Sequence, residues 1–352
     1  MKKLGFFGKM FYFVNIVFGL LLIASYFVPL IYPGTIPFIA TLSLLMPVLM
    51  IINIVFVLLW IMNLNIRFIF SLVILILGIN HIDNFFRWSN SQFVGSEDLK
   101  VMTFNVRMFN VFNWIKEPGI ENEIYDLVKN ESPDIVAFQE YHQMKNFDIG
   151  DYEYTHFYYP GTEKYWGQAI FSKYKIISNG NVKFPSTSNS AVYIDIDVNG
   201  DYVRVYSIHL ETLSLDKSDL ALDKAFDISD SKNNIGNNVR SIASKIDKGF
   251  GRHGEQADLL REHINSSPYP VIVMGDFNSS AFSYEYREIR GDLVDAFEVG
   301  GQGFGKTFDF KYFPLRIDFV FGDPNFRVVG FKTLNNKALS DHYPVMASYN
   351  IR

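Results

Sequence analysis

Acidic, amide and imidazole side chains follow or precede apolar, strand-like runs at several places in the later two thirds of this 352-residue chain. Near the C-terminus, Ser340-Asp341-His342 opens one such run, and Arg316-Ile317-Asp318 begins the run before it. A carboxylate that hydrogen-bonds one imidazole nitrogen fixes the tautomer of the ring and raises its pKa. We predict that Asp318 orients His342 and that Asp341 faces a metal ion. The pattern is typical of a metal-dependent phosphoesterase.

Two other apolar runs end in hard oxygen donors. Residues 101–104 lead into Asn105, and residues 135–138 lead into Gln139 and Glu140. Amide and carboxylate oxygens hold Mg²⁺ or Mn²⁺ in preference to zinc. Taken singly, Asn105 could cap a turn and Glu140 could be a solvated acid at a strand end. Together with the later motifs, they predict a magnesium site.

Residues 203–208 alternate in the manner of a half-buried strand, and His209 follows directly. An imidazolium at that strand end could neutralise a phosphate oxygen in the transition state. The alternative is a histidine that is simply hydrogen-bonded inside the fold. His209 is therefore a candidate for phosphate binding and for catalysis.

A short, continuous apolar run at residues 270–274 ends in Gly275-Asp276-Phe277-Asn278. The glycine permits a tight turn, so the side chains of Asp276 and Asn278 point the same way. An aspartate there can orient or deprotonate a water molecule, and Asn278 can donate to a phosphoryl oxygen. The alternative is an ordinary turn, since these residue types also favour turns.

Arg252 precedes a predicted helix and is a candidate for binding substrate phosphate, although a solvated residue at a helix start is the simpler reading. The glycine-rich residues 301–308 predict a flexible loop. A phosphate cradle would need a helix directly after it, and Phe308-Asp309-Phe310 does not begin one.

Short runs rich in β-branched and aromatic residues predict strands that alternate with amphipathic stretches. Helices are predicted at residues 121–130 and 254–264 from apolar side chains at helical spacing. The polar residues 216–250 predict an insertion that crosses one edge of the site. The predicted strands are 99–104, 135–138, 169–172, 192–198, 203–209, 271–274, 317–321 and 344–349.

The order of these motifs resembles that of the endonuclease/exonuclease/phosphatase family, which has the deoxyribonuclease-I-like fold. The resemblance covers residues 98–352. It implies an α/β fold, a four-layer α/β sandwich in which two mixed β-sheets pack face to face with helices outside. It also implies Mg²⁺-dependent hydrolysis of a phosphomonoester or a phosphodiester.

The resemblance also implies a role for each site residue. Attack should be in line, by water and without a covalent intermediate, because the chain has no cysteine and no serine at a nucleophile elbow. The implied roles are Glu140 as principal metal ligand with Asn105 beside it, Asp341 near the metal and His342, Asp276 activating or positioning water, Asn278 binding the scissile phosphate, His209 and His342 stabilising phosphoryl charge, and Asp318 orienting His342.

Residues 1–95 predict an all-α membrane region of about three transmembrane helices, at residues 11–32, 36–62 and 66–80. A cleaved signal peptide would explain the first run, but that run exceeds a signal core and two more follow it. The third run has only about 15 residues and could be re-entrant or interfacial. The aromatic residues after it favour an interfacial end.

Basic residues predict the orientation in the membrane. Lys2, Lys3 and Lys9 precede the first predicted span, and Arg67 lies in the second loop, so the N-terminus should be cytoplasmic. Three spans then place the catalytic domain outside the cytoplasm, in a periplasmic or extracellular location. If the third run does not cross, the domain is cytoplasmic.

Charge and cysteine content exclude several classes of protein. The first 95 residues carry five basic side chains and one acidic one, which leaves a formal charge of −9 for the remainder. An acidic domain argues against a broad electrostatic grip on nucleic acid. The absence of cysteine excludes disulfides, thiol catalysis and zinc thiolates.

The predicted function is therefore that of a membrane-anchored, Mg²⁺-dependent phosphoesterase, with Mn²⁺ as a substitute ion. Its expected partners are the lipid bilayer and a phosphate ester, namely a lipid head group, a nucleotide or a nucleic acid. The sequence indicates no protein partner. The alternatives are an extracytoplasmic nuclease for DNA or RNA and a catalytically silent binding module on a membrane stem.

Overall fold

The computed structural model describes residues 4–36, 39–88, 97–143, 149–160, 166–212, 249, 251–311 and 313–351. The chain divides into two compact units. The first unit comprises Met1–Phe85, Thr212–Glu255 and Ser279–Arg287, and the second comprises Phe86–Glu211, Gln256–Asn278 and Glu288–Arg352. All the candidate site residues except Arg252 belong to the second unit.

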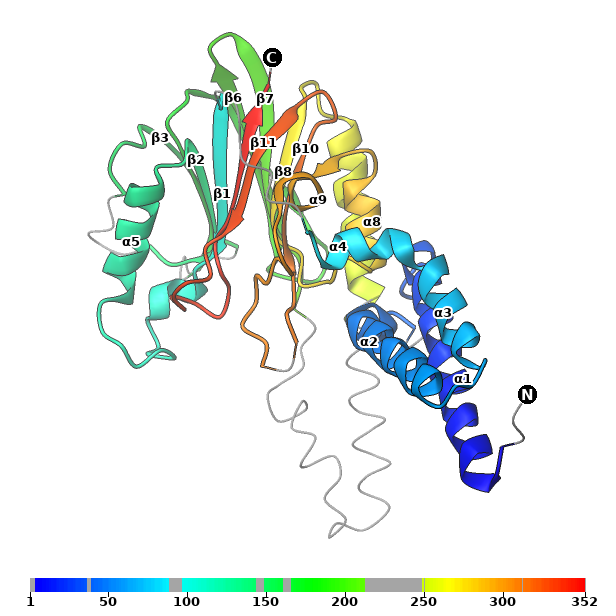
Figure 1. The fold of residues 1–352 in the computed structure, drawn as a ribbon. Coiled ribbons are helices and arrows are strands. Elements are labelled where there is room, and N and C mark those ends of the chain that lie inside the picture. The colour runs from blue at the N-terminus through cyan, green and yellow to red at the C-terminus, as the bar shows by residue number, and fades with distance from the viewer. Residues whose placement is uncertain are drawn as a thin grey trace. The chain divides into compact units, whose positions relative to one another are not determined.

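Two six-stranded mixed sheets make up most of the second unit (Figure 1). The strand orders are β11-β12-β1-β2-β4-β3 and β5-β6-β7-β8-β10-β9. In each sheet one neighbouring pair is parallel, β1 with β2 and β7 with β8. The strands are β1 Leu99–Asn105, β2 Ile135–Tyr141, β3 Tyr154–Tyr158, β4 Gly167–Ser172, β5 Ile176–Lys183, β6 Ser190–Val198, β7 Asp201–His209, β8 Val271–Asp276, β9 Val294–Asp295, β10 Asp318–Gly322, β11 Arg327–Thr333 and β12 Val345–Asn350.

Aliphatic side chains from both sheets form the central core of this unit. Val101 and Ile135 of the first sheet are fully buried together with Ile194, Val205 and Ile272 of the second. Alternation along each strand sends these side chains to the inner face, so the two sheets pack against each other over one apolar layer.

Helices cover the outer faces of the two sheets (Figure 1). The helix α5, Ile120–Glu131, buries Ile124 and Val128 in a cluster with Phe138 of the first sheet. Residues 251–265 are helical, and within this helix His263 accepts or donates a hydrogen bond at 2.9 Å from the hydroxyl of Tyr206 in β7. The four-layer sandwich predicted from the sequence is therefore confirmed. Shorter helices are α8 Tyr284–Arg290 and α9 Ala296–Gly300, and the element η3, Arg107–Asn110, is a turn with a non-helical backbone.

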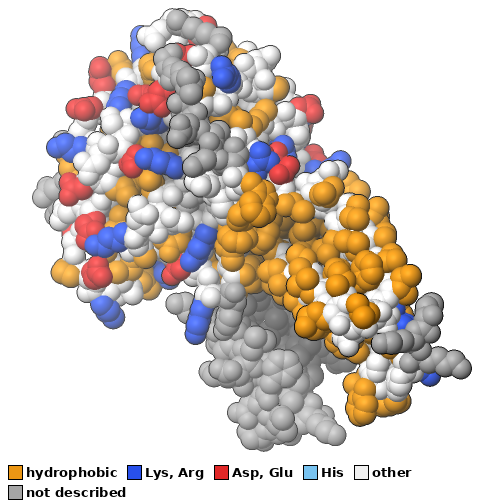
Figure 2. Space-filling model, in the orientation of Figure 1, with side chains coloured by type: hydrophobic (Ala, Val, Ile, Leu, Met, Phe, Trp, Pro, Cys, Tyr) orange, Lys and Arg blue, Asp and Glu red, His pale blue; other side chains and the backbone are white. Residues whose placement is uncertain are grey.

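The N-terminal part of the first unit is helical and strongly apolar. Side chains on the visible surface of these helices are mostly hydrophobic, whereas acidic and basic groups alternate over the visible face of the second unit (Figure 2). The helices are α1 Phe6–Phe27, η1 Val28–Leu30, α2 Thr41–Met62, α3 Phe68–Leu77, η2 Ile79–His81 and α4 Ile82–Phe85.

Buried polar side chains join the three longest of these helices. Asn15 of α1 donates to the Ser71 hydroxyl at 2.6 Å and accepts from the Trp60 indole at 2.9 Å. Ser71 of α3 donates in turn to Asn53 of α2 at 2.9 Å. Hydrogen bonds between polar side chains are a common means of joining helices in an apolar environment.

Two or three of the described helices correspond to the three predicted membrane segments, with different boundaries. Two helices, Phe6–Leu30 and Thr41–Met62, are long and apolar enough to cross a membrane. The third predicted segment, at 66–80, corresponds to Phe68–Leu77 and Ile79–Phe85, which meet at a bend of 57° and would form a third span only as one continuous element. The bend follows Gly78, a residue that favours the end of a helix.

Candidate active site

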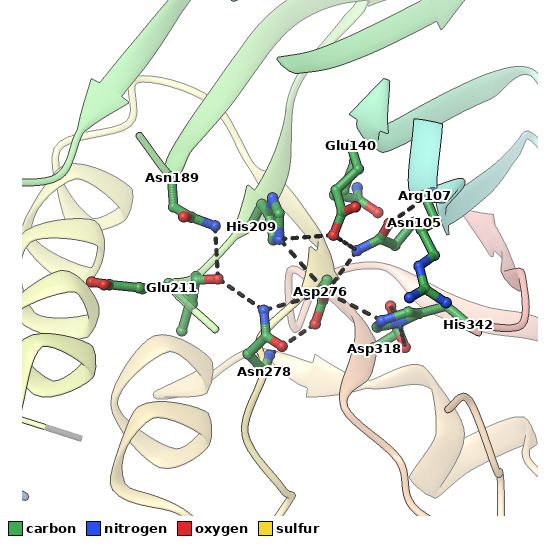
Figure 3. A network of polar contacts seen from close by, with 12 residues as sticks. Asn105, Arg107, Glu140, Asn189, His209, Glu211, Asp276, Asn278, Asp318 and His342 are labelled. Atoms are coloured by element: carbon green, nitrogen blue, oxygen red, sulfur yellow. Dashed lines mark hydrogen bonds and ion pairs between the residues drawn. The ribbon is translucent and has the colours of Figure 1, made fainter. Parts of the chain in front are cut away.

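Strand register brings the candidate residues to one edge of the second unit. In the second sheet, His209 of β7 lies opposite Asp276 of β8, and Asp276 lies opposite Asp318 of β10. In the first sheet, Asn105 of β1 lies opposite Gln139, the neighbour of Glu140. Figure 3 shows Asp276 at the centre of these side chains, with Asn105 and Glu140 of the first sheet directed towards it.

Gly275 permits the close approach of β8 to β7 directly before Asp276. Its φ is +144°, and a Cβ at this position would lie 2.1 Å from the backbone oxygen of Ile208. Residues with a side chain rarely adopt this backbone conformation, and a Cβ atom cannot lie so close to a backbone oxygen. The glycine predicted to turn the chain is therefore required for the position of Asp276.

Asp276 is the centre of the hydrogen-bond network. Its Oδ2 accepts from the Asn105 amide at 3.0 Å, and its Oδ1 accepts from the backbone N–H of Asn278 at 2.8 Å. The Nε2 atoms of His342 and His209 lie 3.6 Å and 3.8 Å from Oδ2. Burial raises the pKa of Asp276, and the neighbouring charge of Asp318 adds to that effect.

His342 is held by Asp318. Its Nδ1 lies 3.0 Å and 3.1 Å from the two carboxylate oxygens of Asp318, and the ring of Phe308 packs edge-on at 4.9 Å. Burial by itself lowers the pKa of His342, but the carboxylates of Asp318 and Asp276 outweigh burial and raise the pKa to about 10. The ring is therefore an imidazolium near neutral pH, with Nε2 directed towards Asp276.

Glu140 and Asn105 form the other half of the site. The Asn105 amide donates to Glu140 Oε1 at 3.1 Å, and burial raises the pKa of Glu140. His209 Nε2 lies 3.9 Å from Glu140 and is buried without a hydrogen-bond partner among the described residues. Burial lowers the pKa of His209, so the neutral ring is favoured over the imidazolium considered from the sequence.

The donor set fits a hard divalent cation. Asp276, Asp318 and His342 bring ligand atoms within 4.8 Å of one another. The carboxylates around His342 raise its pKa, however, which favours the protonated ring, and a protonated imidazole cannot coordinate a metal. Glu140, whose side chain is 27% exposed, leaves room for the water molecules that Mg²⁺ retains. Rotating the Asn105 side-chain amide by a half-turn would exchange its nitrogen and oxygen and would place the oxygen beside the Glu140 carboxylate.

Residues 102–342 match the family model described as Endonuclease/Exonuclease/phosphatase family. The chain belongs to this family. A second model, described as a domain of unknown function, matches residues 8–85. No curated protein matches the sequence.

Several solved structures share the fold of this chain. The human Nocturnin catalytic domain with bound sulfate has 16% identity and a TM-score of 0.52, over 74% of this chain and 97% of that one. D. rerio TDP2 complexed with a single-strand DNA product has 16% identity and a TM-score of 0.51, over 72% and 98%. The mannosyl-6-phosphatase of Bacteroides thetaiotaomicron has 18% identity and a TM-score of 0.50, over 72% and 99%.

Asp341 forms an ion pair that the sequence did not indicate. Its Oδ2 lies 2.8 Å from Arg107 Nη1, and the Arg107 guanidinium also stacks at 4.4 Å over the ring of Trp114. The Arg107 backbone N–H donates to Asn105 at 3.1 Å. Sequence analysis did not identify Arg107 as a site residue. The signal available in the sequence was a basic residue two positions after Asn105. The predicted contact of Asp341 with a metal stays a prediction.

The turn that carries Arg107 has an unusual backbone. Four consecutive residues, Arg107 to Asn110, have φ between +43° and +60°. Non-glycine residues rarely adopt this left-handed conformation, which costs free energy and is concentrated at the functional sites of proteins. Two hydrogen bonds between the Asn110 side chain and the backbone of Ile115 fix the turn.

A chain of buried polar side chains behind the site was also missed. Gln139 donates to Ser207 at 2.9 Å, Ser207 donates to Gln168 at 2.8 Å, and Gln168 donates to the Ser190 hydroxyl at 3.1 Å. Each of these bonds joins one sheet to the other. Gln139 also exchanges hydrogen bonds with Thr103 of β1.

Asn278, Arg252 and the predicted insertion are the other parts of the predicted site. Asn278 donates to the backbone oxygen of Leu210 at 2.9 Å, and its own φ is +48°. Arg252 lies in the helix of residues 251–265 and in the first unit, so its predicted role in phosphate binding stays a prediction. The insertion predicted at residues 216–250 lies outside the described residues, apart from Gly249.

Proposed function

We propose that the protein is a membrane-anchored, Mg²⁺-dependent phosphoesterase that hydrolyses a phosphodiester or a phosphomonoester by in-line attack of water. The observation that carries this proposal is the position of Asp276. Its carboxylate is hydrogen-bonded by Asn105 and flanked by His209 and His342, at the edge where both sheets end. The family assignment supports a phosphoesterase or nuclease in general terms.

Glu140 and Asn105, with Asp341 nearby, would hold the metal ion, which supplies Lewis-acid polarisation of the phosphoryl group. Mn²⁺ would satisfy the same oxygen donors.

Asp276 positions the attacking water and takes its proton. Asn278 and the neutral His209 hydrogen-bond phosphoryl oxygens. The protonated His342, oriented by Asp318, places a positive charge where negative charge develops in the transition state. No side chain forms a covalent bond to the substrate in this scheme.

We assign residues 1–95 to a membrane anchor and residues 98–352 to the catalytic domain. The anchor is supported by two helices long enough to cross a bilayer. The basic residues at the N-terminus favour a cytoplasmic start. With the bent pair Phe68–Leu77 and Ile79–Phe85 as the third span, the catalytic domain is periplasmic or extracellular.

The proposed substrates are lipid head groups, nucleotides and nucleic acids. The Bacteroides thetaiotaomicron relative is a phosphatase by name, and the D. rerio relative is complexed with single-strand DNA product. The acidic balance of residues 96–352 favours a small or lipid-borne phosphate over a long nucleic acid.

The full-length protein in detergent should be assayed with Mg²⁺ or Mn²⁺ against a chromogenic phosphodiester, plasmid DNA, RNA, inositol phosphates and phospholipids. Asp276→Asn preserves the shape of the side chain and removes the base, so activity should be lost. Asp323→Asn, at an exposed turn, is the matched control. Activity that survives Asp276→Asn, or that is absent from the unmodified protein on every substrate, would contradict the proposal.

A C-terminal reporter that is active only outside the cytoplasm tests the orientation. Strong reporter activity is expected. Strong activity of a cytoplasm-only reporter at the same position would exclude the three-span topology.

A further inference from the structure

An exposed aromatic cluster lies at the start of the second unit. The ring of Phe86 packs edge-on against both Trp88 and Phe304, with centroids 4.8 Å apart in each pair. Trp88 is 86% exposed and Phe304 is 45% exposed. We call these three residues the aromatic patch. A surface tryptophan next to an exposed phenylalanine marks a binding surface more often than an isolated apolar residue does.

Two backbone hydrogen bonds fix the patch as one surface. Arg87 N–H donates to the Gly303 oxygen at 2.9 Å, and Gly303 N–H donates to the Arg87 oxygen at 2.9 Å. This antiparallel bridge joins the segment of Phe86 and Trp88 to the loop of Phe304, a loop more than 200 residues away in the sequence. A surface that contacts Trp88 therefore also lies close to Phe304.

Covalent continuity identifies the surface that this patch meets. Phe86 directly follows Phe85, the last residue of the bent helix pair that is apolar enough to cross a membrane. A residue joined to the end of a span lies at the membrane–water interface, where tryptophan and other aromatic side chains are favoured.

We propose that Phe86, Trp88 and Phe304 insert into the interfacial region of the lipid bilayer. The catalytic unit then contacts the membrane through its own loop as well as through its anchor. This inference rests on the membrane anchor of the proposed function.

The same loop leads directly to the active site. Four residues after Phe304, the ring of Phe308 packs against catalytic His342. The intervening Thr307 accepts hydrogen bonds from the backbone N–H groups of Asp318 and Tyr343. Four residues span at most about 14 Å, so the site lies within reach of phosphate groups at the bilayer surface. A head-group phosphate is thus the substrate class that this geometry favours.

The lack of cysteine makes site-specific labelling direct. Trp88→Cys and Phe304→Cys would be labelled with a polarity-sensitive fluorophore in the full chain, in nanodiscs of phosphatidylcholine and phosphatidylglycerol. Gln302→Cys, in the same loop, keeps all three rings of the patch intact. Ile177→Cys, in β5 and 41% exposed, is the control.

Labels at positions 88, 302 and 304 should emit at shorter wavelength than the label at 177. They should also be quenched about twofold more by a nitroxide attached near the lipid head group. Labels at 302 and 304 that behave like the label at 177 would overturn the inference, even if the label at 88 meets lipid.

This readout does not depend on activity. Lipid contact at positions 302 and 304 in a protein that hydrolyses no substrate would leave the inference standing and would count against the proposed function. Hydrolysis by a protein whose labels at positions 302 and 304 do not contact lipid would support the proposed function and would overturn the inference.

Discussion

Replacing Asp318 by asparagine should remove much of the pH dependence that His342 gives to the stability of the catalytic unit. Both side chains are buried, and His342 Nδ1 lies 3.0 Å from Asp318 Oδ2. Burial acts to lower the pKa of His342, and the carboxylates of Asp318 and Asp276 raise it from 6.5 to about 10. Asparagine keeps a hydrogen-bond acceptor and removes one of the two charges.

The sign and the magnitude follow from the shift. Because the folded-state pKa of His342 is above its unfolded value, the stabilisation is fully present below pH 6.5 and is lost as pH rises through about 10. At about 1.4 kcal/mol per pKa unit, the shift corresponds to roughly 5 kcal/mol, and the loss between those limits is about 1.4 kcal/mol for each pH unit. Since Asp276 remains, Asp318→Asn should cost about 2–4 kcal/mol at pH 6.5.

The assay is the free energy of unfolding of the full chain in detergent, from urea denaturation followed by tryptophan fluorescence at pH 6.5, 7.5 and 8.5. Asp323→Asn is the control, because Asp323 accepts a backbone hydrogen bond at an exposed turn. The difference between wild type and Asp318→Asn should shrink by up to about 3 kcal/mol across this range. A difference that stays constant would refute the conclusion that Asp318 holds His342 protonated.

Three further substitutions test other parts of the site. Glu140→Gln should lower kcat about 100-fold or more and weaken Mn²⁺ binding measured by calorimetry, and unchanged Mn²⁺ affinity would exclude Glu140 as a ligand. Gly275→Ala should lower the free energy of unfolding by about 3 kcal/mol or more in urea denaturation, since its Cβ would meet the Ile208 oxygen at 2.1 Å; a stable variant would contradict the required approach. Gln168→Leu should cost about 1–3 kcal/mol in thermal unfolding by leaving the Ser207 hydroxyl without its acceptor, whereas an unchanged Tm would show that this bond contributes nothing.

Much of the fold was predictable because buried strands and helix faces have strong periodic patterns. The helix predicted at 121–130 is α5, and the strands predicted at 203–209 and 271–274 are β7 and β8. Two of the strands that were missed lack that pattern. The edge strand β5 contains Asn179-Gly180-Asn181, residue types that favour turns, and β3 is only partly buried.

The residues of the candidate site that lie at strand ends could be predicted from the sequence, and so could one contact between them. Asp318 was expected to orient His342, and the two are hydrogen-bonded. The partner of Asp341 was not predictable, because the left-handed turn that brings Arg107 to it has no glycine to signal it. The buried chain through Gln139 was equally hidden, since only the packing of two sheets brings its members together.

That chain of buried side chains has a consequence for how activity is acquired during folding. Gln139 and Gln168 belong to the first sheet, and Ser207 and Ser190 belong to the second, so their hydrogen bonds form only once the two sheets dock. The site itself draws Glu140 from one sheet and Asp276 from the other. A folding intermediate with either sheet alone is therefore inactive, and recovery of hydrolysis after denaturation reports the docking step itself, later than the recovery of secondary structure.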